Sequence, residues 1–205
     1  MKKSILVILI SFLLVVGAAA QGLYLDAGIG LGKATSTWAD VDLLDVFTVE
    51  NDIGIELGAK VGFAPIRKVP LYIVLDVDGV GHRLNFKDSS YFQFNTVLIG
   101  PGVIFYPVDI LQIGGSFGIS NAYVVDDDND VFDAYKRGTA WNIYAALDLG
   151  GKGSGTLLGV KLQTSTNEID LLDFFGADFF EDGVVSAVVE QKISLFSVFV
   201  RFAIR

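Results

Sequence analysis

The sequence has no cysteine, only four prolines and a single histidine in 205 residues. Without cysteine, the chain can form neither a disulfide bond nor a lipid-modified N-terminal cysteine. Long apolar runs are also missing after Val16, and no segment there reaches the about 20 residues that a membrane-spanning helix needs. Any insertion into a membrane must therefore use β-strands. Basic charge is scarce too, because 15 Lys and Arg stand against 24 Asp and Glu, and this acidic balance makes nucleic acid an unfavourable partner.

The first twenty residues have the pattern of an export signal. Two lysines precede an apolar run over 5–16, and the small residues of 17–20 follow. A basic start, a short apolar stretch and an Ala-x-Ala end are typical of a cleavable secretory signal peptide. A retained membrane anchor is the alternative, although the run is shorter than a spanning helix. We expect a signal peptide over 1–20 and one exported β domain over 21–205.

Alternation of apolar and polar residues dominates the rest of the chain. In DIGIELGAKVGF (52–63), every second residue is apolar, and the residues between them are charged or glycine. A period of two is typical of a β-strand with one apolar face. The chain contains eight such segments, most of them 11 or 12 residues long. This length is close to the roughly 9–11 residues of a tilted strand that crosses a bilayer.

The connections between these segments alternate in length. Short turns marked by proline or glycine lie at 65–70, 106–109 and 150–155. The longer loops are expected at 34–51, 83–90, 121–138 and 166–183. Short turns at one end, long loops at the other and an even strand count are typical of transmembrane β-barrels.

The apolar strand faces could point into the core of a soluble sandwich or outward to lipid. The polar faces are rich in glycine, which weakens a strand and is unusual on a solvent-facing sheet. An eight-stranded barrel explains the glycines, because its interior is only wide enough for side chains and long charged residues need room. We therefore predict an all-β protein: an eight-stranded antiparallel up-and-down transmembrane β-barrel with short periplasmic turns and long extracellular loops.

Charged residues on the polar faces predict an ionic network inside this barrel. Counted from the short turns, most of them lie at similar heights, and closure of the barrel brings Asp26 on the first strand close to Arg201 on the last. The predicted lumen network consists of Asp26, Glu56, Lys60, Asp76, Lys161 and Arg201. Asp78 and Asp148 lie on the same polar faces outside this network. Paired charges that fill space are one interpretation, since buried charges persist only when paired; a gate whose pairs exchange partners is the other.

The first strand, LYLDAGIGLG (23–32), and the last, SLFSVFVRFAIR (194–205), carry a family resemblance. Together with the signal peptide and the loop asymmetry, they resemble the small outer-membrane β-barrels of Gram-negative-type bacteria, the class of OmpA membrane domains, OmpX and OmpW. The resemblance implies a cell outer-membrane location, contact with outer-membrane lipid and recognition by the barrel insertion machinery. Members of the class usually end on an aromatic residue, whereas this chain ends on Arg205. The apolar parity also changes within 184–205, for which we expect a bulge near 190–195.

The last predicted loop is unusually apolar for an exposed segment. Its candidate binding residues are Leu171, Leu172, Phe174, Phe175, Phe179 and Phe180. They could form a self-packed lid over the barrel mouth, touch the outer leaflet, or bind an extracellular partner or a small apolar ligand.

No catalytic, cofactor or metal site is expected. His82 is followed by Arg83 and Leu84 and lacks the His-x-Ser spacing of one family of lipid-modifying barrel enzymes. The acidic stretch 126–130 has carboxylates at calcium-loop spacing, but Val131 stands where the tight-turn glycine should be. We therefore expect a non-enzymatic barrel with a structural or surface-interaction role. A narrow transporter for a small apolar molecule is the alternative, and a lipid-modifying enzyme is less favoured.

Overall fold

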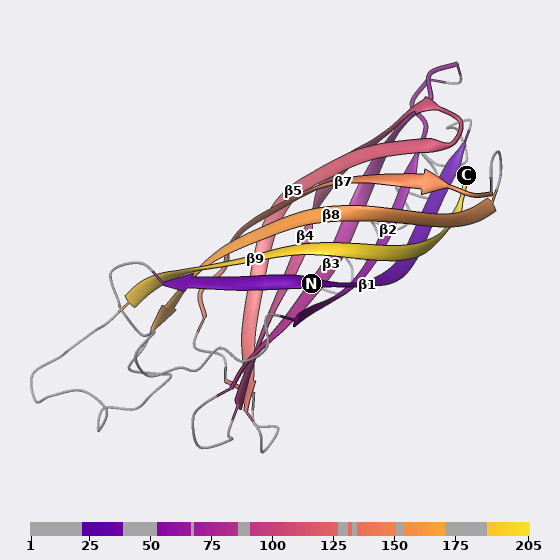
Figure 1. Cartoon of the computed structure of the whole chain (residues 1–205). Coiled ribbons are helices and arrows are strands. Elements are labelled where there is room, and N and C mark those ends of the chain that lie inside the picture. The colour runs from indigo at the N-terminus through magenta and orange to yellow at the C-terminus, as the bar shows by residue number, and fades with distance from the viewer. Residues whose placement is uncertain are drawn as a thin grey trace, which may run out of the picture.

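Eight long antiparallel strands close into a barrel in the computed structural model of the chain (Figure 1). The structure describes residues 22–38, 53–66, 68–85, 91–126, 131–132, 135–150, 154–170 and 188–205. Its strands are β1 (Leu23–Trp38), β2 (Ile53–Phe63), β3 (Leu71–Asn85), β4 (Tyr91–Val108), β5 (Leu111–Asp126), β6 (Val131–Phe132), β7 (Gly138–Asp148), β8 (Ser154–Asp170) and β9 (Val188–Ile204). The predicted signal peptide lies outside the described residues. Within the described ranges, no helix is long and apolar enough to cross a membrane.

Each long strand pairs with its neighbours in chain order, and β1 pairs with β9 to close the ring. The two-residue β6 only extends the pairing of β5 at its outer end. The stagger of the barrel can be read by starting at Tyr24 and stepping from each residue to its paired residue on the next strand. After one turn around the ring, this path returns to β1 at Ala34, ten residues further along. For eight strands, this stagger corresponds to a strand tilt of about 40°. Such a barrel is only wide enough for side chains to fill it.

The two ends of the barrel differ as predicted. The connections at 64–70, 109–110 and 149–153 lie at one end, together with the C-terminus at the upper right of Figure 1. The strand ends at Trp38, Ile53, Asn85, Tyr91, Asp126, Asp170 and Val188 lie at the opposite end. We call these the short-turn end and the loop end. The predicted fold class, an eight-stranded antiparallel up-and-down barrel, is confirmed.

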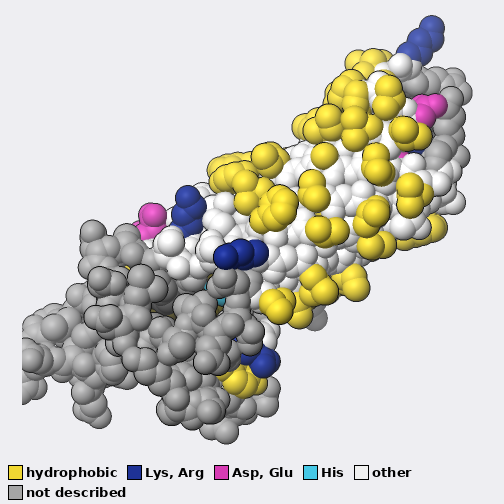
Figure 2. Space-filling model, in the orientation of Figure 1, with side chains coloured by type: hydrophobic (Ala, Val, Ile, Leu, Met, Phe, Trp, Pro, Cys, Tyr) yellow, Lys and Arg dark blue, Asp and Glu magenta, His cyan; other side chains and the backbone are white. Residues whose placement is uncertain are grey.

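The outer wall carries an apolar belt, visible as yellow side chains that begin at the short-turn end (Figure 2). Its members are large side chains that are each at least about one third exposed: Leu25, Ile29 and Leu31 of β1, Ile53, Ile55 and Leu57 of β2, Ile73 and Val77 of β3, Ile99, Val103 and Phe105 of β4, Ile113, Phe117 and Ile119 of β5, Trp141, Ile143 and Leu147 of β7, Leu158 and Val160 of β8, and Phe196, Val198, Val200 and Phe202 of β9. A continuous apolar surface of this extent needs lipid around it rather than water.

The polarity of the wall inverts toward the loop end. On β9, the outward residues change from Phe196 to Ser194, Lys192 and Glu190, while the inward Leu195 and Ile193 are apolar and buried. The inward residues at this level form an apolar upper cluster of Ala34, Val80, Phe94, Val124, Ile169, Ile193 and Leu195. The barrel is therefore apolar outside and polar inside within the belt, and apolar inside above it.

This inversion corrects two sequence expectations. Most strands are longer than the predicted 11 or 12 residues, since six of the eight in the ring have 15 to 18. The bulge expected near 190–195 is also wrong, because β9 pairs in one continuous register with both β1 and β8. Its apolar parity changes because the strand leaves the membrane there, and the apolar side chains then belong inside.

Candidate functional site

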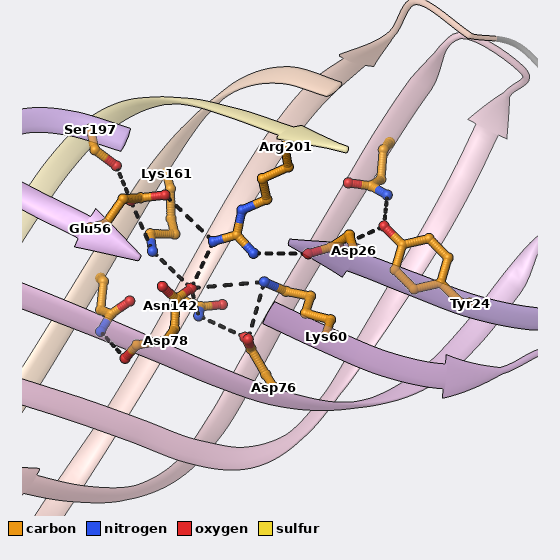
Figure 3. A network of polar contacts seen from close by, with 12 residues as sticks. Tyr24, Asp26, Glu56, Lys60, Asp76, Asp78, Asn142, Lys161, Ser197 and Arg201 are labelled. Atoms are coloured by element: carbon orange, nitrogen blue, oxygen red, sulfur yellow. Dashed lines mark hydrogen bonds and ion pairs between the residues drawn. The ribbon is translucent and has the colours of Figure 1, made fainter. Parts of the chain in front are cut away.

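Seven charged side chains from five strands meet in the middle of the lumen (Figure 3). We call this set the ionic layer. It consists of Asp26 of β1, Glu56 and Lys60 of β2, Asp76 and Asp78 of β3, Lys161 of β8 and Arg201 of β9. Each residue is at most 5% exposed, so the whole layer is buried inside the barrel. All six residues of the network predicted from the sequence lie in this layer.

Arg201 links the first strand to the second and third. Its Nη1 lies 3.1 Å from Asp26 Oδ1, and its Nη2 lies 3.0 Å from Asp78 Oδ2 and 3.4 Å from Glu56 Oε1. Pairing of β1 with β9 sets Arg201 directly opposite Gly28, so the long side chain passes over a residue without one. The planar guanidinium can serve three carboxylates because it carries five donors in a fixed geometry.

Lys161 is the second cation of the layer. Its Nζ lies 2.9 Å from Glu56 Oε2 and 2.8 Å from Asp78 Oδ2. The Ser197 hydroxyl donates a further hydrogen bond to Glu56 Oε2. Both Glu56 oxygens therefore have charged or hydroxyl partners, which a buried carboxylate requires.

Lys60 is the third cation, on the far side of the layer from Ser197 in Figure 3. Its Nζ lies 3.1 Å from Asp76 Oδ1 and 3.8 Å from Asp78 Oδ2, and 5.0 Å from the centroid of the Tyr144 ring. Asn142 Nδ2 donates to Asp76 Oδ2 at 2.9 Å. The two Asp76 oxygens are thus shared between a cation and an amide.

Asp78 is the residue that the sequence prediction left out of the network. Its Oδ2 lies within 3.8 Å of the nitrogens of Lys60, Lys161 and Arg201, so among the described residues it alone contacts all three cations. The signal was present, because Asp78 shares a strand face with Asp76. Asp78 lies two residues further from the short turn than Asp76, so a count along the strand placed it at a different level of the barrel. Because the strands are tilted, residues at different distances from their own turns can still be neighbours in the lumen.

Tyrosine and glutamine side chains continue the network toward the short-turn end. Tyr24 donates to Asp26 Oδ2 at 2.8 Å, and Gln112 Nε2 donates to the hydroxyls of Tyr24 at 2.6 Å and Tyr106 at 2.8 Å. An aromatic lower cluster fills the lumen around them: Tyr24, Val74, Ile104, Tyr106, Tyr144, Ala146, Leu157, Phe199 and Ala203. The ionic layer therefore lies between the aromatic lower cluster and the apolar upper cluster.

At the short-turn end itself, Arg205 and Asp148 form an ion pair. Arg205 Nη2 lies 3.3 Å from Asp148 Oδ2, and the guanidinium lies 4.0 Å above the centroid of the Tyr106 ring. Arg205 Nη2 also donates to the carbonyl of Asp109 in the turn between β4 and β5, at 3.1 Å. Arg205 thus connects β9 with Tyr106 of β4, with the turn between β4 and β5, and with Asp148 of β7.

Inward glycines make room for the layer. A Cβ on Gly58 would lie 2.6 Å from both Arg201 Nη2 and Asp78 Oδ1, and one on Gly30 would lie 2.6 Å from Glu56 Cγ. Atoms this close must move, and Arg201 and Asp78 are paired with each other at 3.0 Å, so moving them disturbs this ion pair.

We expect Gly58→Val to destabilise the barrel by about 1–3 kcal/mol through this overpacking. The matched control is Gly79→Val, because Gly79 faces outward and the nearest atom to an added Cβ is the Leu57 carbonyl at an ordinary 3.6 Å. The control should change stability by no more than about 0.5 kcal/mol. Urea unfolding of protein refolded into lipid vesicles, followed by tryptophan fluorescence, measures both. Equal effects of the two substitutions would contradict the packing account.

The other sequence candidates do not join the layer. His82 of β3 is 1% exposed and faces the lumen. The candidate loop residues Leu171, Leu172, Phe174, Phe175, Phe179 and Phe180 lie outside the described residues, as do most of the acidic stretch 126–130 and the serines that follow β3. In the part of the chain that the structure describes, no group of three His, Cys, Asp or Glu side chains is arranged to hold a metal ion.

No protein-family model matches the chain, and no curated protein sequence matches it. Several solved structures are similar to it, among them the following three. The first is Ail, the attachment invasion locus protein of Yersinia pestis, in complex with the heparin analogue sucrose octasulfate. Its sequence is 10% identical to this chain, the alignment covers 88% of this chain and 99% of Ail, and the TM-score is 0.49. Neisserial surface protein A has 15% identity, 89% and 97% coverage and a TM-score of 0.48. The outer membrane protein OprG from Pseudomonas aeruginosa has 8% identity, 91% and 97% coverage and a TM-score of 0.43.

Similarity at this level says nothing about activity, and the architecture follows from the chain's own geometry. The barrel is closed, its belt is apolar, its lumen is polar within the belt, and its short turns share one end. These are the properties of an outer-membrane β-barrel, in which the short turns are periplasmic and the long loops extracellular. The chain is accordingly an integral outer-membrane barrel protein, with its loop end outside the cell.

Proposed function

We propose that this protein is a non-enzymatic, non-conducting outer-membrane barrel with a structural or surface-interaction role. The observation that carries the proposal is the ionic layer, whose seven side chains are each at most 5% exposed. A conducting lumen would leave such side chains in contact with water.

The energetics of the layer support the same proposal. Charges out of water are costly, and their mutual attraction offsets the cost only when the geometry is good. Lys161 has two carboxylate contacts below 3.0 Å, and Arg201 has contacts with three carboxylates. An ion passing through would have to displace these pairs, so the network serves better as a plug that orders the strands than as a path.

A surface role places recognition at the loop end. The long connections there are extracellular by the orientation of the barrel, and outer-membrane lipid surrounds the belt. The apolar residues of segment 171–180 are our candidates for contact with an extracellular partner or a small apolar ligand. The barrel insertion machinery is the proposed partner during assembly, acting on the C-terminal strand.

Bilayer conductance tests the proposal. Wild-type protein in planar bilayers is expected to show no single-channel currents, whereas Glu56→Ser combined with Lys161→Ser should admit water and ions, because it removes a matched pair and much side-chain volume from the layer. A heat-dependent mobility shift on gels verifies that both proteins are folded. Currents from the wild type equal to those of the double variant would overturn the non-conducting barrel.

A transporter for a small apolar molecule is the second candidate, and one observation favours it. The lumen above the ionic layer is filled by the apolar upper cluster, including Val80, Phe94 and Leu195, and these are the side chains that an apolar molecule would contact there. Faster uptake of an apolar fluorescent probe by liposomes containing the protein than by empty ones would support this candidate. The enzyme hypothesis predicts altered membrane lipids that revert when His82 is replaced by alanine.

A further inference from the structure

A groove of about 720 Å³ lies on the outer wall of the barrel, across β2, β3 and β4. Its floor is formed by Gly79 and Gly81, which face outward on β3 and present no side chains. A Cβ on Gly79 would make only ordinary contacts, the nearest of them at 3.6 Å, so a side chain at this position would fit and would fill the floor. This volume lies within the range of about 300–1,000 Å³ that is usual for small-molecule sites.

The strand register divides the groove into three rungs. The lowest rung is Leu57, Gly79 and Val97, which are paired across the three strands, and the next is Ile55, Gly81 and Asn95. The top rung pairs Arg83 with Gln93. The groove is therefore apolar where it begins within the belt and polar where it ends above it.

The polar end is ordered and positively charged. Gln93 Nε2 donates to Asn95 Oδ1 at 2.9 Å, and Asn95 Nδ2 donates to the Gln93 carbonyl at 3.2 Å. The exposed Arg83 guanidinium lies 3.9 Å above the centroid of the Tyr91 ring. Stacking on an aromatic ring restrains a guanidinium while leaving its donors available to an anion.

We propose that this groove binds a phosphate-bearing lipid of the outer leaflet that carries a net negative charge. One acyl chain lies on Gly79 and Gly81, between the β2 side chains and Val97, and the phosphate lies at Arg83 with the amides of Gln93 and Asn95 beside it. The medium around the belt is lipid, so the lower part of the groove faces acyl chains. Arginine favours phosphate because its forked donors match the phosphate oxygens. The proposal depends on the orientation of the barrel and not on the proposed function.

A second groove gives the contrast and the control. It has a volume of about 400 Å³ and lies nearer the short-turn end, against Ala27 of β1 and Ala59 of β2. Its two charged lining residues, Asp26 and Lys60, point into the lumen and are buried in the ionic layer. This groove has apolar walls without an exposed cation, so we expect it to hold acyl chains without preference for a headgroup.

Native mass spectrometry of the protein released from nanodiscs tests the proposal. The nanodiscs contain phosphatidylcholine with a minor fraction of phosphatidylglycerol, or of lipid A in a parallel series. Wild type should retain one phosphatidylglycerol or lipid A molecule in preference to phosphatidylcholine. Gly79→Leu, which fills the floor, and Arg83→Gln, which removes the charge, should each lower this retention about tenfold, as expected for losing a charged hydrogen bond or the chain contacts.

Two matched controls accompany these variants. Ala59→Leu fills the second groove, and Lys192→Gln removes an exposed cation from β9; both should retain the anionic lipid like the wild type. A heat-dependent mobility shift identifies folded protein, and Arg83→Gln keeps the test decisive if Gly79→Leu fails to fold. Unchanged retention in folded Arg83→Gln, or no preference of the wild type for the anionic lipid, would overturn the proposal. A second copy of the chain in place of lipid would overturn it too.

Discussion

Replacing Arg201 with glutamine is expected to destabilise the barrel by about 3–5 kcal/mol, the usual cost of breaking a buried ion pair. The substitution leaves Asp26 without its cation and removes one cation each from Glu56 and Asp78. The layer then holds four buried carboxylates against two cations. Urea unfolding in lipid vesicles measures the loss, with the lipid-facing Trp141 as the fluorescent reporter.

Lys136→Gln is the matched control for this prediction. Lys136 Nζ lies 3.8 Å from Glu168 Oε2, but both side chains are about 60% exposed, so water already screens the pair. Its removal should cost less than about 1 kcal/mol. If Arg201→Gln were as mild as this surface change, the ionic layer would not be the element that holds the strands together.

Lys161→Met is expected to cost a similar amount, about 3–5 kcal/mol, and addition of Glu56→Gln should recover most of it. The methionine keeps the volume of the side chain but leaves Glu56 and Asp78 short of a partner at 2.9 Å and 2.8 Å. Removing the Glu56 charge as well restores the original excess of one carboxylate over the cations. Deleting charges in pairs is therefore far less damaging than deleting one alone.

A double-mutant cycle measures this coupling directly. We expect a coupling energy above about 1.5 kcal/mol for Lys161 with Glu56, which is in the range for residues that share a network. Lys161→Met combined with Asp148→Asn is the control, because Asp148 pairs with Arg205 at the short-turn end. Those two changes should add within about 0.5 kcal/mol. Additivity in both cycles would show that the layer is a set of independent charges.

The architecture and most of the charged layer could be predicted from the sequence. A strand with period two has only two faces, so DIGIELGAKVGF had either Ile55 and Leu57 or Glu56 and Lys60 on the lipid side. The number of segments and the alternation of turn lengths then selected a closed barrel. In the structure Ile55 and Leu57 are 58% and 67% exposed on the wall, while Glu56 and Lys60 are buried in the lumen.

Two features depended on the assembled barrel. The stagger of ten residues around the ring brings Asp78 level with Lys161 and Arg201, although the count along each strand places it elsewhere, and no single segment contains that stagger. The position at which the apolar belt ends, toward the loop end, could not be predicted from the sequence either. In β9, apolar and polar residues alternate both before Leu195 and after Phe196. The large apolar residues point mainly inward up to Leu195 and mainly outward from Phe196 onward. Which face of a strand is apolar depends on what surrounds it. Lipid surrounds the wall of the belt and a packed interior lies above it, and both environments exist only once the strands have closed into a barrel.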